Sequence, residues 1–239
     1  MIDIRTTLRE TGYCLVRGDD LDIDRTDLRN ENAFVAEWDD LHRDNYLKNG
    51  ARFRERRYGR FRYVPNERTV QLLPHQPYFQ SEEANSYAGG IHRVVAPLTP
   101  STVRNVLMNH LIETDFARFP IDADDDRRNR AWEVACHQFR IIARPGEVGE
   151  PTPEGIHRDE IDYGAIHLIS RSDAAGGHSR VYDNGKNLLA ELVLESRWDT
   201  LYWADRQVLH SVTPITPVGA AERAVRDILI LGYTCDPEA

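Results

Sequence analysis

The chain has 239 residues, of which 41% are hydrophobic and 29% are charged. With a mean hydropathy of −0.56, this composition is typical of one soluble globular domain and excludes a collagen, a coiled coil or a disordered polymer. The formal net charge of −9 argues against a nucleic-acid or anionic-membrane binder, and no apolar run is long enough for a transmembrane helix.

The N-terminal part predicts two helices separated by a strand. A short helix is expected over residues 4–10, ended by Gly12, and residues 13–16 form a strand-like run. Apolar residues at helical spacing then continue from residue 24 to about residue 47, which predicts a longer helix.

The middle of the chain predicts a hairpin and a third helix. Between residues 52 and 62, arginines alternate with aromatic residues, which indicates a hairpin that turns near Gly59. We interpret this arginine stripe as a solvated face, and the alternative is a cover over the mouth of a site that draws in anions. Thr-Pro at residues 99–100 is a typical helix start, and the helix is expected to reach about residue 119.

From Trp132 onward the pattern changes to short apolar runs separated by Gly, Pro and Asp. Closely spaced strands without intervening helices predict an antiparallel sandwich or barrel rather than a βαβ fold. We expect one domain over residues 1–239, with helices and supporting strands in 1–130 and a β core in 131–235. The predicted strands cover residues 132–143, 163–170, 180–182, 188–194, 198–203, 207–213 and 225–233.

The three cysteines, Cys14, Cys136 and Cys235, are widely spaced and contain no CxxC pair. They predict neither a disulfide framework nor a cysteine zinc site, and they favour a reducing cytoplasm. The first residues carry acid early and lack the apolar segment of a signal peptide, which also fits a cytoplasmic location.

Two histidines and one aspartate are candidates for a metal site. His157 and Asp159 are two residues apart in a stretch expected to be extended, so their side chains point to the same side. His210 lies in the later strand-like run. Two imidazoles and one carboxylate on one face can hold Fe(II) and leave coordination positions open. The structural alternative is a loop histidine, a turn aspartate and an unrelated strand histidine.

A second His-x-Asp sequence provides an internal comparison. His42-Arg43-Asp44 lies in the pattern that predicts a helix, where residues two apart do not face each other. We therefore interpret it as polar surface and not as a metal site.

Four motifs occur in order in the C-terminal half: Pro153-Glu154-Gly155-Ile156-His157-Arg158-Asp159, Gly176-Gly177-His178-Ser179, His210-Ser211-Val212-Thr213-Pro214-Ile215 and Arg226-Asp227-Ile228-Leu229. Together they resemble the Fe(II)/2-oxoglutarate-dependent dioxygenases. Within that superfamily they are most similar to the bacterial group that includes L-isoleucine 4-hydroxylase and related free amino-acid hydroxylases. The resemblance covers about residues 132–233.

The resemblance implies a mostly β fold with flanking helices around a double-stranded β-helix, the jelly-roll or cupin-like core. His157, Asp159 and His210 would be the ligands of Fe(II). The co-substrates would be 2-oxoglutarate and O2, with ascorbate as an aid in vitro. Arg226 would pair with the distal carboxylate of 2-oxoglutarate, since a guanidinium binds a planar carboxylate through two hydrogen bonds. Arg223 is the competing candidate.

The same resemblance implies hydroxylation of a free L-amino acid with an aliphatic side chain, with release of succinate and CO2. Open alternatives are a modified or carrier-bound amino acid, sulfoxidation or desaturation, and a cupin-type enzyme or binding module that does not use 2-oxoglutarate. The expected partner is a small molecule, with no nucleic acid and no membrane, and the oligomeric state is open.

Further polar residues are candidates for contacts with ligands. Gln138 and Arg140 share one otherwise apolar face of the strand before His157, where they form either a satisfied buried pair or contacts to co-substrate and substrate. Ser179 and Tyr182 follow the Gly-Gly turn and are candidates for the substrate pocket, with ordinary hairpin chemistry as the alternative. We interpret the remaining histidines of the C-terminal and middle regions as structural or surface residues: His75, His92, His110, His137, His167 and His178.

Overall fold

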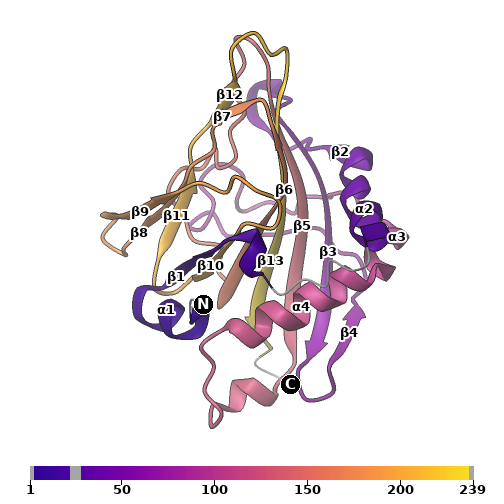
Figure 1. Ribbon diagram of the computed structural model, residues 1–239, viewed down its shortest axis with the longest axis vertical. Helices are drawn as coiled ribbons and strands as arrows, with labels where there is room; N and C mark the ends of the chain where they lie inside the picture. The colour runs from indigo at the N-terminus through magenta and orange to yellow at the C-terminus, as the bar shows by residue number, and fades with distance from the viewer. Residues whose placement is uncertain (1–2, 22–27, 237–239) are drawn as a thin grey trace.

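The computed structural model describes residues 3–21 and 28–236, and its main element is a large antiparallel sheet (Figure 1). Strands from both halves of the chain join in it, because residues 54–63 pair with residues 132–141 and residues 13–16 pair with residues 200–203. In spatial order the strands are β1 (Tyr13–Val16), β10 (Thr200–Ala204), β6 (Tyr163–Ser172), β13 (Ala224–Cys235), β5 (Trp132–Ala143), β3 (Arg54–Val64) and β2 (His42–Arg43), with β4 (Thr69–Leu72) also paired to β3.

Two smaller sheets face the large one and complete a double-stranded β-helix. Apolar side chains of both layers pack together, as Ile166 and Leu201 of the large sheet do with Val181 of β8. At the other end, Ile141 of β5 packs against Ile215 of β12. The jelly-roll core expected from the sequence is confirmed. The smaller sheets contain β11 (Leu209–Val212), β8 (Ser179–Tyr182) and β9 (Leu188–Leu192), and β12 (Ile215–Pro217) with β7 (Ala174–Gly176).

The helices cover the outer face of the large sheet, where α4 crosses the central strands (Figure 1). Leu111 of α4 belongs to one buried cluster with Val134 and Cys136 of β5 and Leu229 and Leu231 of β13. Because side chains alternate along a strand, the opposite face of β5 and β13 points between the sheets. The helical elements are α1 (Ile4–Thr11), η1 (Gly18–Asp20), α2 (Leu28–Ala36), η2 (Glu37–Asp40), η3 (Lys48–Gly50), α3 (Pro100–Arg104), α4 (Val106–Arg118) and η4 (Asp126–Asn129).

The predicted strands of the C-terminal half are confirmed, each within a few residues of its expected ends. The strand over 132–143 has the expected bounds, Trp132–Ala143. The short strands β4, β7 and β12 were missed, because three or four residues carry too little alternation to distinguish them from a loop.

The helices predicted over residues 4–10 and 99–119 are confirmed at their starts, and the second of them is wrong in its continuity. The carboxylate of Asp3 caps α1, and Gly12 ends it in the left-handed conformation with a φ of 81°. The helix expected over 99–119 is broken at Asn105, whose extended backbone ends α3 and whose side chain caps α4. A second cap inside the apolar pattern therefore divides one predicted helix into two.

The helix predicted over residues 24–47 is wrong beyond residue 40, and its residues 24–27 lie outside the described part of the chain. Leu41 has an extended backbone, and His42 then pairs with Arg56 as part of β2. Asp44 is 3% exposed and forms an ion pair with Arg54 at 2.8 Å, so it is not polar surface. The helical spacing of apolar residues misled the prediction here, because pairing with β3 and the buried ion pair of Asp44 determine the conformation of this segment.

The hairpin predicted to turn near Gly59 is also wrong, since Gly59 lies inside the continuous strand β3. A Cβ atom at this position would lie 2.8 Å from the side chain of Leu98, so glycine serves a close approach between segments. The arginine stripe is not a solvated face either, because Arg54, Arg56 and Arg57 are all buried. Within the described residues, no helix is both long and apolar enough to span a lipid bilayer.

A buried polar network joins α4 to the large sheet. Asp115, which is fully buried, accepts a hydrogen bond of 2.6 Å from the hydroxyl of Tyr202 and lies 2.8 Å from Nε2 of His167. The other ring nitrogen of His167 lies 2.8 Å from the hydroxyl of Thr200. Each of these buried polar groups has a hydrogen-bond partner, because an unpaired polar group at this depth would lower the stability of the fold.

We expect Asp115→Ala to lower the free energy of unfolding by about 3 kcal/mol or more, because it leaves Tyr202 and His167 buried without their acceptor. Urea unfolding followed by circular dichroism measures the change. Asp122→Ala is the control, since Asp122 pairs with Arg9 on the exposed surface. Equal stability of Asp115→Ala and the control would contradict the role assigned to this network.

Candidate metal centre

The three residues singled out as metal ligands meet at one point in the structure. Nε2 of His157 lies 3.5 Å from one carboxylate oxygen of Asp159, and Nε2 of His210 lies 3.4 Å from the other. One ligand atom from each residue lies within 4.8 Å of the other two. Both histidines are buried, whereas the Asp159 side chain is 21% exposed. In the part of the chain that the structure describes, this is the one group of three such residues close enough to hold an ion.

The backbone holds the two histidines opposite each other. His157 and His210 form an isolated antiparallel bridge, with two N–H···O hydrogen bonds of 3.0 Å. Nδ1 of His157 donates to the carbonyl of Gly155 at 3.0 Å, which leaves Nε2 without a proton in the neutral ring and directed at Asp159. The loop that carries the His-x-Asp sequence is thereby fastened to β11.

A buried carboxylate fixes the position of Asp159 from behind. Asp205, which is fully buried, accepts hydrogen bonds from the backbone N–H groups of Asp159 at 3.0 Å and Ile161 at 3.2 Å. It also accepts the indole N–H of Trp203 at 3.1 Å, and the Trp203 ring lies 5.0 Å from that of His210. Sequence reasoning missed Asp205, because its role depends on backbone groups distant in sequence.

The electrostatics of the group suit a cation. Burial alone would raise the pKa of Asp159, but the His210 and His157 imidazoles lower it on balance, so the carboxylate is ionised. Burial and the neighbouring His157 lower the pKa of His210 to about 4, so this ring is neutral. Burial also opposes charge on His157, but its hydrogen bond to Asp159 outweighs this and raises the His157 pKa to about 9. A metal ion therefore displaces one proton from this site.

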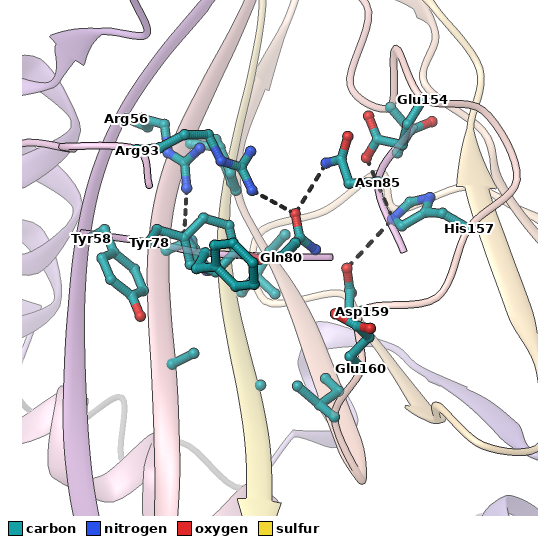
Figure 2. A pocket seen from close by; sticks show the side chains of 18 of the residues that line it. Arg56, Tyr58, Tyr78, Gln80, Asn85, Arg93, Glu154, His157, Asp159 and Glu160 are labelled. Carbon is teal, nitrogen blue, oxygen red and sulfur yellow. Dashed lines mark hydrogen bonds and ion pairs between the residues drawn. The ribbon is translucent and has the colours of Figure 1, made fainter. Parts of the chain in front are cut away.

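The triad opens into a cavity of about 410 Å³ between the sheets. Figure 2 shows His157 and Asp159 on one side of this cavity, and Arg56, Arg93 and Tyr78 on the other. Odd-numbered residues of β5 and even-numbered residues of β13 form part of its wall: Ala135, His137, Phe139, Ile141, Arg226, Ile228, Ile230 and Gly232. The volume is in the range of small-molecule sites.

Arg226 lies in the wall of this cavity and is fully buried. All three of its guanidinium nitrogens lack a hydrogen-bond partner among the described residues. Burial and the neighbouring Arg171 lower its pKa to about 10, so it is still charged at neutral pH. A buried cation without a counter-ion is a site for an anion, and a carboxylate matches its planar fork. Arg223, the competing candidate, is exposed and does not line the cavity.

Gly177 makes room for the Arg226 side chain. Its φ is +68°, and a Cβ atom there would lie 2.9 Å from Nη1 of Arg171 and 3.3 Å from Cδ of Arg226. Any larger residue would strain the turn and press on both arginines. The Gly-Gly motif found in the sequence therefore shapes the space around Arg226.

Gln138 and Arg140 lie on the other face of β5 and do not line the cavity. Arg140 forms an ion pair with Asp227 at 2.8 Å, and its neighbour on that face, Gln138, is fully buried. The expectation that these two side chains contact co-substrate or substrate has no support in this arrangement. The prediction that Gln138 and Arg140 share one face of β5 is confirmed. That face, however, is the one covered by the helices and not the one that borders the cavity.

Ser179 and Tyr182 lie near the triad on β8 without lining the cavity. Ser179 pairs with Val212, a cavity residue, and its buried hydroxyl has no hydrogen-bond partner in the described structure. Tyr182 instead points to the other side of the strand, where its hydroxyl lies 3.2 Å from that of Ser211. A contact with substrate stays a prediction for Ser179, and the structure gives it no support for Tyr182.

Sequence reasoning missed much of the cavity wall opposite the triad. His137, interpreted as structural or surface, lines the cavity and stacks on Tyr58 with ring centroids 4.6 Å apart. Tyr78, Arg56 and Arg93 line it as well. The available signal was the alternation of β5, which places His137 opposite the apolar face.

Comparison with known proteins identifies the family. A family model described as 2OG-Fe dioxygenase matches residues 35–232. The 3(1)-hydroxy-L-isoleucine 4-dioxygenase of Pantoea ananatis is 26% identical over 253 aligned positions, covering 100% of this chain and 98% of its own length. The L-isoleucine-4-hydroxylase of Bacillus thuringiensis is 26% identical over 183 positions, covering 76% of this chain and 75% of its own.

Solved structures agree with this result. A bsmA homolog from Methylobium petroleophilum is 30% identical and superimposes with a TM-score of 0.82 over 96% of this chain and 90% of that one. The IDO structure from Bacillus thuringiensis has a TM-score of 0.78 and 20% identity, with 97% of each chain covered, which shows the shared fold.

We expect His157→Ala to weaken binding of Fe(II) or Mn(II) by more than about 100-fold, since even the outer partners of metal ligands contribute about 10- to 100-fold. Anaerobic titration calorimetry measures the affinity. His42→Ala removes the histidine of the other His-x-Asp sequence, which is exposed on β2, and should leave metal affinity unchanged. Similar losses in both variants would contradict the assignment of the site.

Proposed function

The chain belongs to the 2OG-Fe dioxygenase family, and on this basis we propose that it hydroxylates a free L-amino acid with an aliphatic side chain. The family implies Fe(II), 2-oxoglutarate and O2, and the chain is a non-haem dioxygenase. The proposed reaction converts amino acid, 2-oxoglutarate and O2 into hydroxyamino acid, succinate and CO2. The names of the two relatives, one acting on 3(1)-hydroxy-L-isoleucine and the other on L-isoleucine, support this substrate class.

One observation carries the proposal: a triad of His157, Asp159 and His210 shares a cavity with the buried, unpaired guanidinium of Arg226. Two imidazoles and one carboxylate fit Fe(II), and they leave positions for other ligands. Arg226 fits the distal carboxylate of 2-oxoglutarate. We extend the proposal to one dioxygenase domain over residues 1–239, since β1 and β3 belong to the same sheet as the strands around the site.

When bound, Fe(II) together with 2-oxoglutarate and O2 supplies the oxidising power that replaces a C–H bond by C–OH. The residues of this chain supply position and shelter. Gly155 and Asp205 fix the ligands His157 and Asp159 through the hydrogen bonds described above. The apolar side chains of Phe139 and other wall residues exclude water from part of the cavity. Regioselectivity then depends on how firmly the two ends of the substrate are held, because a displacement of about 1 Å alters the outcome.

The test of the proposed function is turnover of pooled proteinogenic amino acids by the purified protein with Fe(II), ascorbate, 2-oxoglutarate and O2. We expect succinate and one amino acid that gains a single oxygen atom, both measured by mass spectrometry and both absent with His157→Ala. Succinate without an oxidised free amino acid would contradict the substrate class and favour a modified or carrier-bound amino acid. Absence of succinate from iron-loaded protein would contradict the proposed reaction.

For Arg226→Gln we expect a rise of about 100-fold in the KM for 2-oxoglutarate, because a charge-assisted bidentate contact is lost. Metal affinity and the free energy of unfolding of the metal-free protein should not fall, since the wild-type guanidinium is buried and has no partner in the described part of the chain. Arg223→Gln is the matched control on the same segment, exposed and outside the cavity. An unchanged KM in Arg226→Gln would rule out this contact.

A further inference from the structure

A second group of arginines lies in the same cavity, away from Arg226. Arg56 of β3 and Arg93 of the following loop region both line the cavity and are each 2% exposed. Figure 2 shows their side chains extending toward the cavity opposite His157 and Asp159. Arg93 was not a candidate in the sequence, and the stripe that contains Arg56 was interpreted as a solvated face, with a cover that attracts anions as the alternative.

The protein supplies too little negative charge for these arginines. Arg54 forms an ion pair with Asp44, whose Oδ2 lies 2.9 Å from Nε and 2.8 Å from Nη2 of the guanidinium. Arg56 reaches the same oxygen only at 3.5 Å, and it donates from Nη2 to the neutral nitrogen Nδ1 of His137 at 2.9 Å. The Nε atom of Arg56 is buried and has no hydrogen-bond partner among the described residues.

Arg93 has no carboxylate within hydrogen-bonding distance in the described structure. Its Nη2 donates to the amide oxygen of Gln80 at 2.7 Å, and its buried Nε has no partner. Asn85 donates to the same oxygen of Gln80 at 3.0 Å, which orients the amide toward Arg93. Two nearly buried guanidinium groups thus retain donors that the protein itself does not satisfy, which is costly unless an anion binds there.

The two guanidinium groups are also fixed in place relative to each other. Both lie over the ring of Tyr78, that of Arg93 at 4.6 Å from the ring centroid and that of Arg56 at 5.3 Å. Stacking on one aromatic ring restricts both side chains before any ligand arrives, so little conformational entropy is lost on binding. The pair is therefore a built anion site and not a mobile surface patch.

We propose that Arg56 and Arg93 bind the α-carboxylate of the amino-acid substrate, while Arg226 serves the co-substrate from another part of the cavity wall. This assignment rests on the proposed function and names the residues that would hold one end of the substrate. One carboxylate of the cavity wall favours an amino acid at this site over a dicarboxylate. Glu154 also lines the cavity, 3.5 Å from Nε2 of His157, and would attract an α-ammonium group but repel a second carboxylate.

The test measures binding and not turnover. Anaerobic calorimetry on the Fe(II)-loaded protein with 2-oxoglutarate present would compare L-isoleucine, L-leucine, L-valine and L-methionine with their primary amides, which lack the carboxylate charge. For the amino acid that the wild type binds, Arg93→Gln should weaken affinity by about 10- to 100-fold. Affinity for the matching amide should change little, so that preference for the acid is lost.

Three further measurements make the result decisive. Arg93→Lys keeps a charge but loses the fork and should give a smaller loss than Arg93→Gln. Affinity for 2-oxoglutarate should stay within about twofold in both variants, which also shows that they fold. Arg62→Gln removes one exposed positive charge from β3, the strand that contains Arg56, at a position outside the cavity. It should change neither amino-acid affinity nor 2-oxoglutarate affinity.

Two outcomes would overturn this assignment alone and leave the proposed function intact. Unchanged amino-acid affinity in Arg93→Gln would exclude the contact, and a loss confined to 2-oxoglutarate would place the co-substrate at this pair. Wild-type protein that binds 2-oxoglutarate but none of the amino acids would have a different meaning. It would contradict the proposed substrate class, and this assignment would fail with it.

Discussion

The site depends on one backbone contact, the pair of hydrogen bonds between His157 and His210. Each residue donates to and accepts from the other at 3.0 Å, which joins a long loop after β5 to the short strand β11. Thr152 also exchanges two hydrogen bonds with the backbone of Val212, but the contact between His157 and His210 is the one that sets the two imidazoles opposite each other. Asp205 completes the frame by accepting the N–H of Asp159, so the three ligands are positioned by main-chain geometry rather than by side-chain packing alone.

The fold and the triad could be predicted from the sequence because both leave a signal in short stretches of the chain. Strand-length apolar runs after Trp132 correspond to the jelly-roll strands, and the order of four motifs identifies His157, Asp159 and His210. The sequence did not suffice to choose between the two faces of β5. Alternation separates Gln138 from His137, but only the position of α4 and its neighbours decides which face is covered and which borders the cavity.

The arginines of β3 show a different limit. A charged, aromatic stretch has the same appearance in sequence whether it is solvated or buried. Its burial depends on Asp44, which precedes it, and on the packing of Tyr78 and Arg93, which follow it. A contact between residues distant in sequence also explains the wrongly predicted turn. Gly59 has no side chain because Leu98 packs directly against its backbone. Interactions of this kind appear only once the strand is placed in the large sheet.

The position of Trp203 places a fluorescent side chain beside the metal-binding residues. Its indole donates to Asp205, which holds the metal-binding loop, and its ring lies 5.0 Å from that of His210. The indole is almost fully buried, so its emission responds to its immediate neighbours more than to bulk solvent. The chain therefore contains an intrinsic fluorophore next to a ligand residue, and we expect occupancy of the centre to change the emission of Trp203 without any added label.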